Sequence, residues 1–98
     1  MKPSLELKKH NQEIVKLISK YGLSNPRVFG SVAAGTDHEG SDLDLLVDPS
    51  STTSLFDMGG LYEDLANLLD CPFQILCPGD ISEHFRHEVL KKAIPIIK

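Results

Sequence analysis

The segment of residues 42–48, DLDLLVD, constrains the fold of this chain more than any other part of its sequence. Its apolar residues, bounded by Pro49, are typical of a β-strand. Because side chains alternate along a strand, Asp42 and Asp44 share one face. Aspartate is uncommon in strands, so two aspartates at these positions call for an explanation. We therefore predict a strand that is open on this acidic face and buried on the opposite face, which carries Leu43, Leu45 and Val47.

Helical and strand patterns alternate along the rest of the chain. Ser54 is suited to cap a helix, with Asp57 three residues on as in a variant of the capping box, but the Gly59-Gly60 pair predicts that this helix starts late or kinks. The alternation predicts an α/β (α+β) fold, in which helices pack mainly on one face of a small mixed sheet. In the last helix, the side chains expected to point inward are Phe85, Val89 and Leu90. The predicted helices cover residues 4–21, 55–69 and 82–92, the predicted strands cover residues 27–29, 42–48 and 73–77, and residues 94–97 either add a short strand or dock.

Composition indicates a single domain, residues 1–98, and excludes several classes of protein. With 41% hydrophobic and 24% charged residues, the chain is neither disordered nor membrane-spanning. Its net charge of −4 and lack of a basic stripe argue against direct nucleic-acid binding. The first ten residues contain no apolar signal segment, so we expect a cytoplasmic protein with no membrane partner. Cys71 and Cys77 fit neither a zinc site nor a redox motif and are expected to be buried or half-buried thiols.

The two aspartates predict a metal site. Carboxylates this close repel each other, which raises their pKa values unless a cation lies between them. Mg²⁺ and Mn²⁺ are hard cations that prefer carboxylate oxygens and keep positions open for substrate phosphates. We therefore expect Asp42 and Asp44 to bind Mg²⁺ or Mn²⁺. The alternative is a solvated strand start, which is the better interpretation of an isolated D-x-D tripeptide.

The Gly30-Ser31 pair directly follows the predicted strand of residues 27–29. Glycine lets a backbone approach a ligand closely. If residues 32–34 form a short helix, its first amides and the Ser31 hydroxyl could receive a phosphate. The alternative is an ordinary turn capped by serine. The combination of a strand, Gly-Ser, ten further residues and D-x-D on a second strand favours a phosphate and metal site over both alternatives.

The pattern Gly30-Ser31-x10-Asp42-Leu43-Asp44 resembles the signature of the DNA-polymerase-β-type nucleotidyltransferase superfamily. Chain length and flanking residues resemble its minimal nucleotidyltransferase (MNT) branch, and the resemblance covers nearly the whole chain. It implies a polymerase-β-like fold in which the aspartates hold two metal ions. It further implies that the Gly-Ser turn holds the β- and γ-phosphates of a nucleoside triphosphate, with Ser41 as another nucleotide-binding residue. The implied reaction transfers a nucleoside monophosphate, expected to be AMP from ATP, to an acceptor hydroxyl.

Two departures from the family pattern bear on activity. Many members carry arginines in the turn, as in G-S-R-A-R-G, where this chain has Val32 and Ala34, so we expect weaker nucleotide binding. The family also supplies a third catalytic carboxylate from a following strand, and Gln74 stands at that position. Glutamine coordinates metals weakly and cannot act as a base at neutral pH, which predicts slow chemistry. If this alignment is shifted, Asp70 or Asp80 could supply the carboxylate.

The MNT resemblance also implies a partner protein. Small MNT proteins are typically encoded beside a HEPN-domain ribonuclease toxin and act as its antitoxin by AMPylating it or by blocking it. Two functions therefore remain open for this chain. One is metal-dependent transfer of AMP. The other is a binding module that has lost most of its catalytic activity, and Gln74 is the residue that distinguishes these two functions. Either function is compatible with a homo-oligomer or a hetero-oligomer.

Overall fold

The computed structural model describes residues 1–97, and Lys98, the last residue of the predicted domain, lies outside this range. Each predicted helix and strand is present, and the main difference is that the first strand begins at Ser24 instead of residue 27. Within the described range, no helix has the length and apolar character needed to cross a membrane. The elements of this range are α1 (Pro3–Lys20), β1 (Ser24–Phe29), α2 (Gly30–Ala34), β2 (Leu43–Asp48), α3 (Leu55–Leu68), β3 (Phe73–Leu76), the 3₁₀ turn η1 (Pro78–Asp80), α4 (Glu83–Lys92) and β4 (Ile94–Pro95).

The strands of the described residues form one mixed sheet in the order β3-β2-β1-β4. Strand β1 runs antiparallel to both β2 and β4, whereas β2 and β3 are parallel. The parallel pair sets Leu43 opposite Phe73 and Asp44 opposite Gln74. The predicted small mixed sheet is therefore confirmed, and the starts of β2 and β3 lie side by side.

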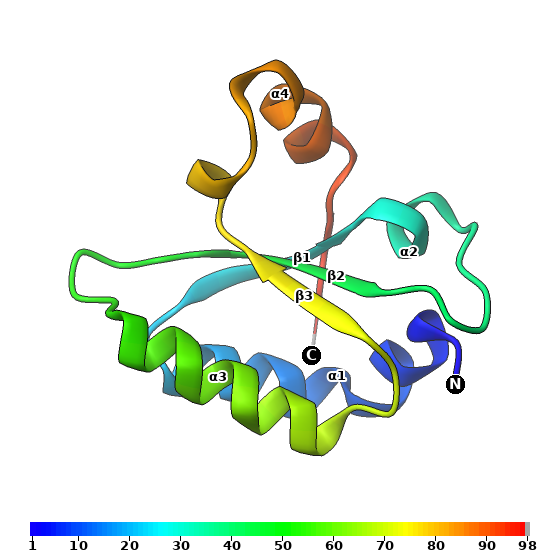
Figure 1. Ribbon diagram of the computed structural model, residues 1–98, viewed down its shortest axis with the longest axis horizontal. Coiled ribbons are helices and arrows are strands. Elements are labelled where there is room, and N and C mark those ends of the chain that lie inside the picture. Colours follow the sequence, from blue (N-terminus) through cyan, green and yellow to red (C-terminus); the bar gives the residue numbers. More distant parts are fainter. Residues whose placement is uncertain (98) are drawn as a thin grey trace.

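The hydrophobic core lies between one face of the sheet and helices α1 and α3 (Figure 1). The predicted apolar face of β2 contributes Leu43, Leu45 and Val47, which are fully buried. Burying each such side chain is worth about 1.5–3 kcal/mol, so this face fixes the orientation of β2 and turns Asp44 to the other side. The helix residues that are buried with these side chains are Ile14 and Ile18 of α1 and Leu61 and Leu65 of α3.

Helix α3 begins with the predicted cap. Ser54 Oγ accepts the Asp57 N–H at 3.2 Å, and Asp57 Oδ2 accepts the Ser54 N–H at 2.9 Å. The predicted late start or kink at Gly59-Gly60 is wrong, because the helix runs without interruption from Leu55 to Leu68. A Cβ at Gly60 would lie 2.5 Å from Tyr21 Cε1. Glycine is needed at this position for close packing against the tyrosine ring.

Helices α2 and α4 lie on the opposite side of the sheet from α1 and α3 (Figure 1). Arg86 holds α4 against the preceding turn, since its Nε donates to the Pro78 carbonyl at 2.9 Å and its Nη2 to the Ile81 carbonyl at 3.0 Å. Strand β4 then follows the helix and pairs with β1. The C-terminal end of α4 is thereby brought to the end of β1.

The predicted inward face of α4 is partly wrong. Phe85 is 65% exposed and Leu90 is 38% exposed, whereas Val89 is half-buried as expected. The half-buried residues of this segment are Arg86, Val89 and Ala93, which follow one another at helical spacing and form the packed face. Phe85 lies to the side of that face and contributes to the surface.

The two cysteines lie just beyond the two ends of β3. Cys71 and Cys77 are half-buried, and neither forms a disulfide. Burial raises the pKa of both thiols, which keeps them protonated at neutral pH. The prediction of buried or half-buried thiols is confirmed.

Candidate active site

The predicted acidic pair lies where β2 begins, on the side of the sheet that faces away from the core. Asp42 is exposed and precedes the strand, and Asp44 is its second residue and half-buried. The register sets Asp44 between Phe29 of β1 and Gln74 of β3. The structure therefore brings Asp44 and Gln74 together, as the alignment of the third strand predicts.

Asp44 has an environment that disfavours its charged form. Burial raises the pKa of Asp44, and the nearby charge of Asp42 raises this pKa further. A hydrogen bond of 2.7 Å from Gln74 Nε2 to Asp44 Oδ1 acts in the opposite direction. A cation at this position would stabilise both carboxylates. The amide of Gln74 supplies part of that stabilisation through its hydrogen bond.

Gly30 brings the Gly-Ser turn close to β2, the strand that carries Asp44. Its φ angle of +66° lies in the left-handed region that favours glycine. A Cβ on this residue would lie 2.1 Å from Asp44 Oδ2. The sequence predicts a close approach of Gly30 to a ligand, and the structure shows a close approach of Gly30 to the carboxylate of Asp44. The short helix expected at residues 32–34 is present as part of α2.

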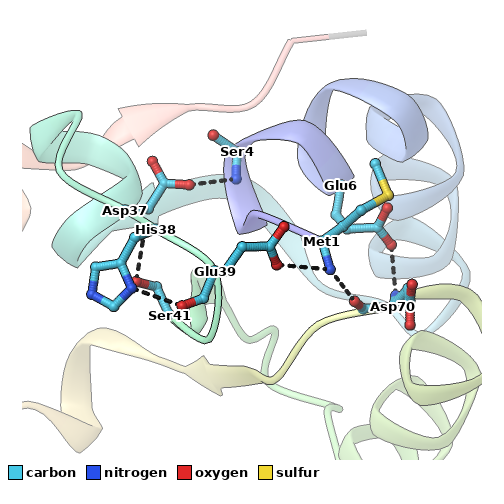
Figure 2. A network of polar contacts seen from close by, with 8 residues as sticks. All are labelled: Met1, Ser4, Glu6, Asp37, His38, Glu39, Ser41 and Asp70. Atoms are coloured by element: carbon cyan, nitrogen blue, oxygen red, sulfur yellow. Dashed lines mark hydrogen bonds and ion pairs between the residues drawn. The ribbon is translucent and has the colours of Figure 1, made fainter.

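The two serines of the predicted site have different surroundings. Ser31 is half-buried in the first turn of α2, and its carbonyl accepts the Thr36 N–H at 2.9 Å. Ser41 closes a turn, because its Oγ accepts the His38 N–H at 3.0 Å and its own N–H donates to the His38 carbonyl at 3.0 Å (Figure 2). The Ser41 hydroxyl therefore shapes the loop that leads to Asp42.

The same loop is fastened to the N-terminus of α1, which the sequence did not reveal. Asp37 Oδ2 accepts the backbone N–H of Ser4 at 2.9 Å (Figure 2). This hydrogen bond holds the pKa of Asp37 below its ordinary value. Lys2, the N-cap residue of α1, makes no side-chain cap of its own. A helix start without a capping side chain is the signal that could have suggested an acceptor from elsewhere in the chain.

The alternative third carboxylates belong to other parts of the structure. The Asp70 N–H donates to Glu6 Oε1 at 2.6 Å, where Glu6 is 1% exposed and its Oε2 has no hydrogen-bond partner among the described residues. Asp80 Oδ2 accepts the Cys77 N–H at 2.9 Å in η1, beyond the far end of β3. Within residues 1–97, no hydrogen bond links either aspartate to Asp44. Gln74 is the side chain that the fold brings to the third position.

The donor set of the site fits a hard divalent cation. Asp42 and Asp44 offer carboxylate oxygens, and Gln74 would offer an amide oxygen if its amide group turned over from its present hydrogen bond. The part of the chain that the structure describes contains no group of three or more His, Cys, Asp or Glu side chains that could hold a metal ion. Any metal at this position would therefore depend on two carboxylates, with water or substrate oxygens completing its coordination.

Comparisons with known proteins show the family of this chain. Residues 12–98 match the family model described as polymerase beta, nucleotidyltransferase. A candidate protein adenylyltransferase from Methanocaldococcus jannaschii is 27% identical over 86 residues, which cover 88% of this chain and 92% of that protein.

Solved structures share the fold. One structure, described as a candidate minimal nucleotidyltransferase, has a TM-score of 0.83 and 35% identity, and the match covers 94% of each chain. A chain of a toxin–antitoxin crystallised with AMP-PNP has a TM-score of 0.72 and 25% identity, over 89% of this chain and 72% of that chain. A mutant of the toxin–antitoxin MntA–HpeT has a TM-score of 0.70 at 20% identity, which shows the fold alone.

Proposed function

This chain belongs to the polymerase beta nucleotidyltransferase family and is a nucleotidyltransferase, and we propose that it transfers AMP from ATP to a hydroxyl group of a partner protein. The proposed partner is a HEPN-domain toxin, for which the chain is the antitoxin, in the cytoplasm. Two relatives support this proposal. One is named as a candidate protein adenylyltransferase, and the other is a toxin–antitoxin crystallised with AMP-PNP.

The observation that carries the proposal is the contact between the Gly-Ser turn and the acidic strand. Gly30 approaches Asp44 so closely that even a methyl group would collide with the carboxylate. Phosphates held at the turn would therefore lie beside the two aspartates. Phosphoryl transfer needs this proximity, because the charge of the phosphates and of the leaving pyrophosphate must be neutralised where it develops.

Each residue of the site has a proposed role. Asp42 and Asp44 hold Mg²⁺ or Mn²⁺, with Gln74 as a weak third ligand. When bound, the metal supplies positive charge to the phosphates and to the attacking and leaving oxygens. The backbone at Gly30 and the hydroxyl of Ser31 bind the β- and γ-phosphates. Further along the same loop, Ser41 contributes a nucleotide contact. The hydroxyl oxygen of the acceptor then bonds to the α-phosphorus as the bond to pyrophosphate breaks, and the hydroxyl proton passes to water.

A second function is favoured by Gln74. This side chain cannot take the proton of the acceptor hydroxyl, so a general base is missing at the position where the family carries a carboxylate. A protein with this site could retain metal and nucleotide binding while turning over very slowly. It would then neutralise its partner by binding alone. This second function shares the partner and the nucleotide with the first and differs in chemistry.

The proposal is tested with the double variant Asp42→Asn/Asp44→Asn. Because the amides remove the negative charge without changing the shape, the variant should remain folded and lose Mn²⁺ binding in calorimetry. Transfer of radiolabelled AMP to the partner should fall to background. Asp70→Asn is the matched control, since it removes an exposed carboxylate near the start of β3 and should leave both measurements unchanged. Equal Mn²⁺ affinity in wild type and double variant would refute the metal site.

A further inference from the structure

A cavity of about 500 Å³ lies between α2 and α4, beside the Gly-Ser turn. Its walls are largely apolar, and it is wide enough for a lysine stem and part of a ligand. Glu88 and Lys92 are the charged residues among those that line it. The residues that line the cavity are Phe29, Gly30, Ala33, Ala34, Glu88, Val89 and Lys92.

Strand pairing brings Lys92 to the level of the turn. Strands β1 and β4 are antiparallel, with Arg27 opposite Pro95 and Val28 opposite Ile94. Gly30, where α2 begins, and Lys92, at the end of α4, line the same cavity. The chain therefore delivers a lysine from the end of α4 to the residue where α2 begins, although the two positions are far apart in the sequence.

Lys92 is also free to serve a ligand. Its Nζ lies 3.1 Å from Glu88 Oε2, and both side chains are largely exposed, so this surface ion pair is weak and easily exchanged. Arg27, by contrast, is paired with Asp48. Arg86 is engaged with two backbone carbonyls of the preceding turn. Neither arginine could reach a ligand without breaking a structural contact.

We infer that Lys92 is a triphosphate-binding residue, whose ammonium leaves Glu88 to contact the phosphates held at the Gly30-Ser31 turn. The inference rests on the proposed function. It explains how the site compensates for the absence of a cationic side chain at Val32 and Ala34 in the turn itself. A triphosphate carries several negative charges, so a cation from a neighbouring helix strengthens its binding through charge-assisted hydrogen bonds.

The test measures binding of ATP and of inorganic tripolyphosphate to the full chain, with Mg²⁺, by calorimetry. Lys92→Ala should weaken both ligands by about tenfold, as expected for the loss of one charge-assisted hydrogen bond. Lys92→Arg should retain most of the affinity. The matched control is Lys91→Ala, which removes the neighbouring exposed lysine that does not line the cavity.

A variant that is expected to bind the ligands more tightly strengthens the test. Glu88→Gln releases Lys92 and removes a repulsive charge from the cavity, so both ligands should bind more tightly than to wild type. Glu83→Gln removes a glutamate at the other end of α4 and should have no effect. Circular dichroism melting checks that each variant remains folded.

Three results separate this inference from the proposed function. If Lys92→Ala binds both ligands as well as Lys91→Ala does, the inference about Lys92 is overturned and the proposed transfer of AMP is unaffected. If wild type transfers no AMP but binds tripolyphosphate in a Lys92-dependent way, the inference holds and the proposed reaction fails. If wild type binds neither ATP nor tripolyphosphate, both are overturned.

Discussion

At the scale of single residues, the tightest constraint in the site is the contact between Gly30 and Asp44. The φ angle of Gly30 is +66°, and a Cβ there would lie 2.1 Å from Asp44 Oδ2. Gly30→Ala should therefore displace the carboxylate and add backbone strain of about 1–2 kcal/mol. We expect a lower melting temperature and at least about tenfold weaker binding of ATP with Mg²⁺, measured by calorimetry.

Gly35→Ala is the matched control for this prediction. Gly35 also has a positive φ angle, +74°, but a Cβ there would have no neighbour within 4 Å. This variant should suffer similar backbone strain and keep its affinity for ATP. Equal ATP affinities in the two variants would mean that the Gly30-Ser31 pair is only a turn.

These residues also show what local sequence can and cannot predict. The pairing of Asp44 with Gln74 could be predicted, because the family resemblance places Gln74 where a third carboxylate joins the acidic pair. The collision between a Cβ at Gly30 and Asp44 could not, because it depends on the angle at which β1 turns into α2. The spacing in the sequence predicted that the Gly-Ser pair and the two aspartates belong to one site. The structure shows that the contact between them is made by Gly30 and Asp44.

At the scale of elements, α1 receives its N-terminal cap from the loop that leads to the acidic strand. The hydrogen bond from the Ser4 N–H to Asp37 lowers the pKa of this carboxyl below its ordinary value. Since the folded pKa is below the unfolded one, the stabilisation is complete above the unfolded pKa and is lost as pH falls through the folded pKa. Asp37→Ala should lower the free energy of unfolding at pH 7 by about 1 kcal/mol, the usual loss for a cap.

Urea unfolding at pH 7 and at pH 3 measures this effect. The difference between wild type and Asp37→Ala should shrink at pH 3, because this pH lies below the ordinary pKa of an aspartate and the unfolded chain there takes up a proton at this position. Asp37→Asn keeps an oxygen acceptor without the charge, so its free energy of unfolding at pH 7 should lie between those of wild type and Asp37→Ala. An unchanged stability of Asp37→Ala at pH 7 would show that the hydrogen bond to Ser4 contributes nothing.

Distance along the chain decides which caps a sequence can reveal. Ser54 and Asp57 are three positions apart, and their reciprocal cap was predicted correctly. Asp37 and Ser4 are 33 positions apart, and no local pattern connects them. The inward position of Phe85 was predicted wrongly for a related reason. A short helix offers several apolar residues, and tertiary contacts decide which of them are covered.

At the scale of the whole molecule, one face of the sheet carries the hydrophobic core and the other carries the candidate active site. Helices α1 and α3 cover one face and form the core, while α2 and α4 lie on the other side, toward which Asp44 of β2 points (Figure 1). The alternation of helices and strands was enough to predict the fold class. The order β3-β2-β1-β4 was not predictable, since the pairing of β4 with β1 involves a strand of two residues with almost no pattern of its own.

Whether the molecule acts on its partner by chemistry or by binding depends on Gln74. Because β3 sets this residue opposite Asp44, Gln74→Asp would add a third carboxylate to the site. Without metal, the new charge should lower the melting temperature through repulsion, and Mg²⁺ should restore it. Transfer of radiolabelled AMP to the partner should increase, by up to roughly 10²–10⁴-fold if the carboxylate also acts as a base.

Comparison of Gln74→Asp with wild type distinguishes the two proposed functions. In the enzymatic case the gain must disappear when Asp42→Asn/Asp44→Asn is added, because the new carboxylate acts only together with the acidic pair. If wild type already transfers AMP rapidly and Gln74→Asp changes nothing, another residue supplies the third ligand. If neither protein transfers AMP and both still neutralise the partner, the chain works by binding, and the amide of Gln74 then serves to stabilise Asp44 in a protein that has given up the chemistry of its family.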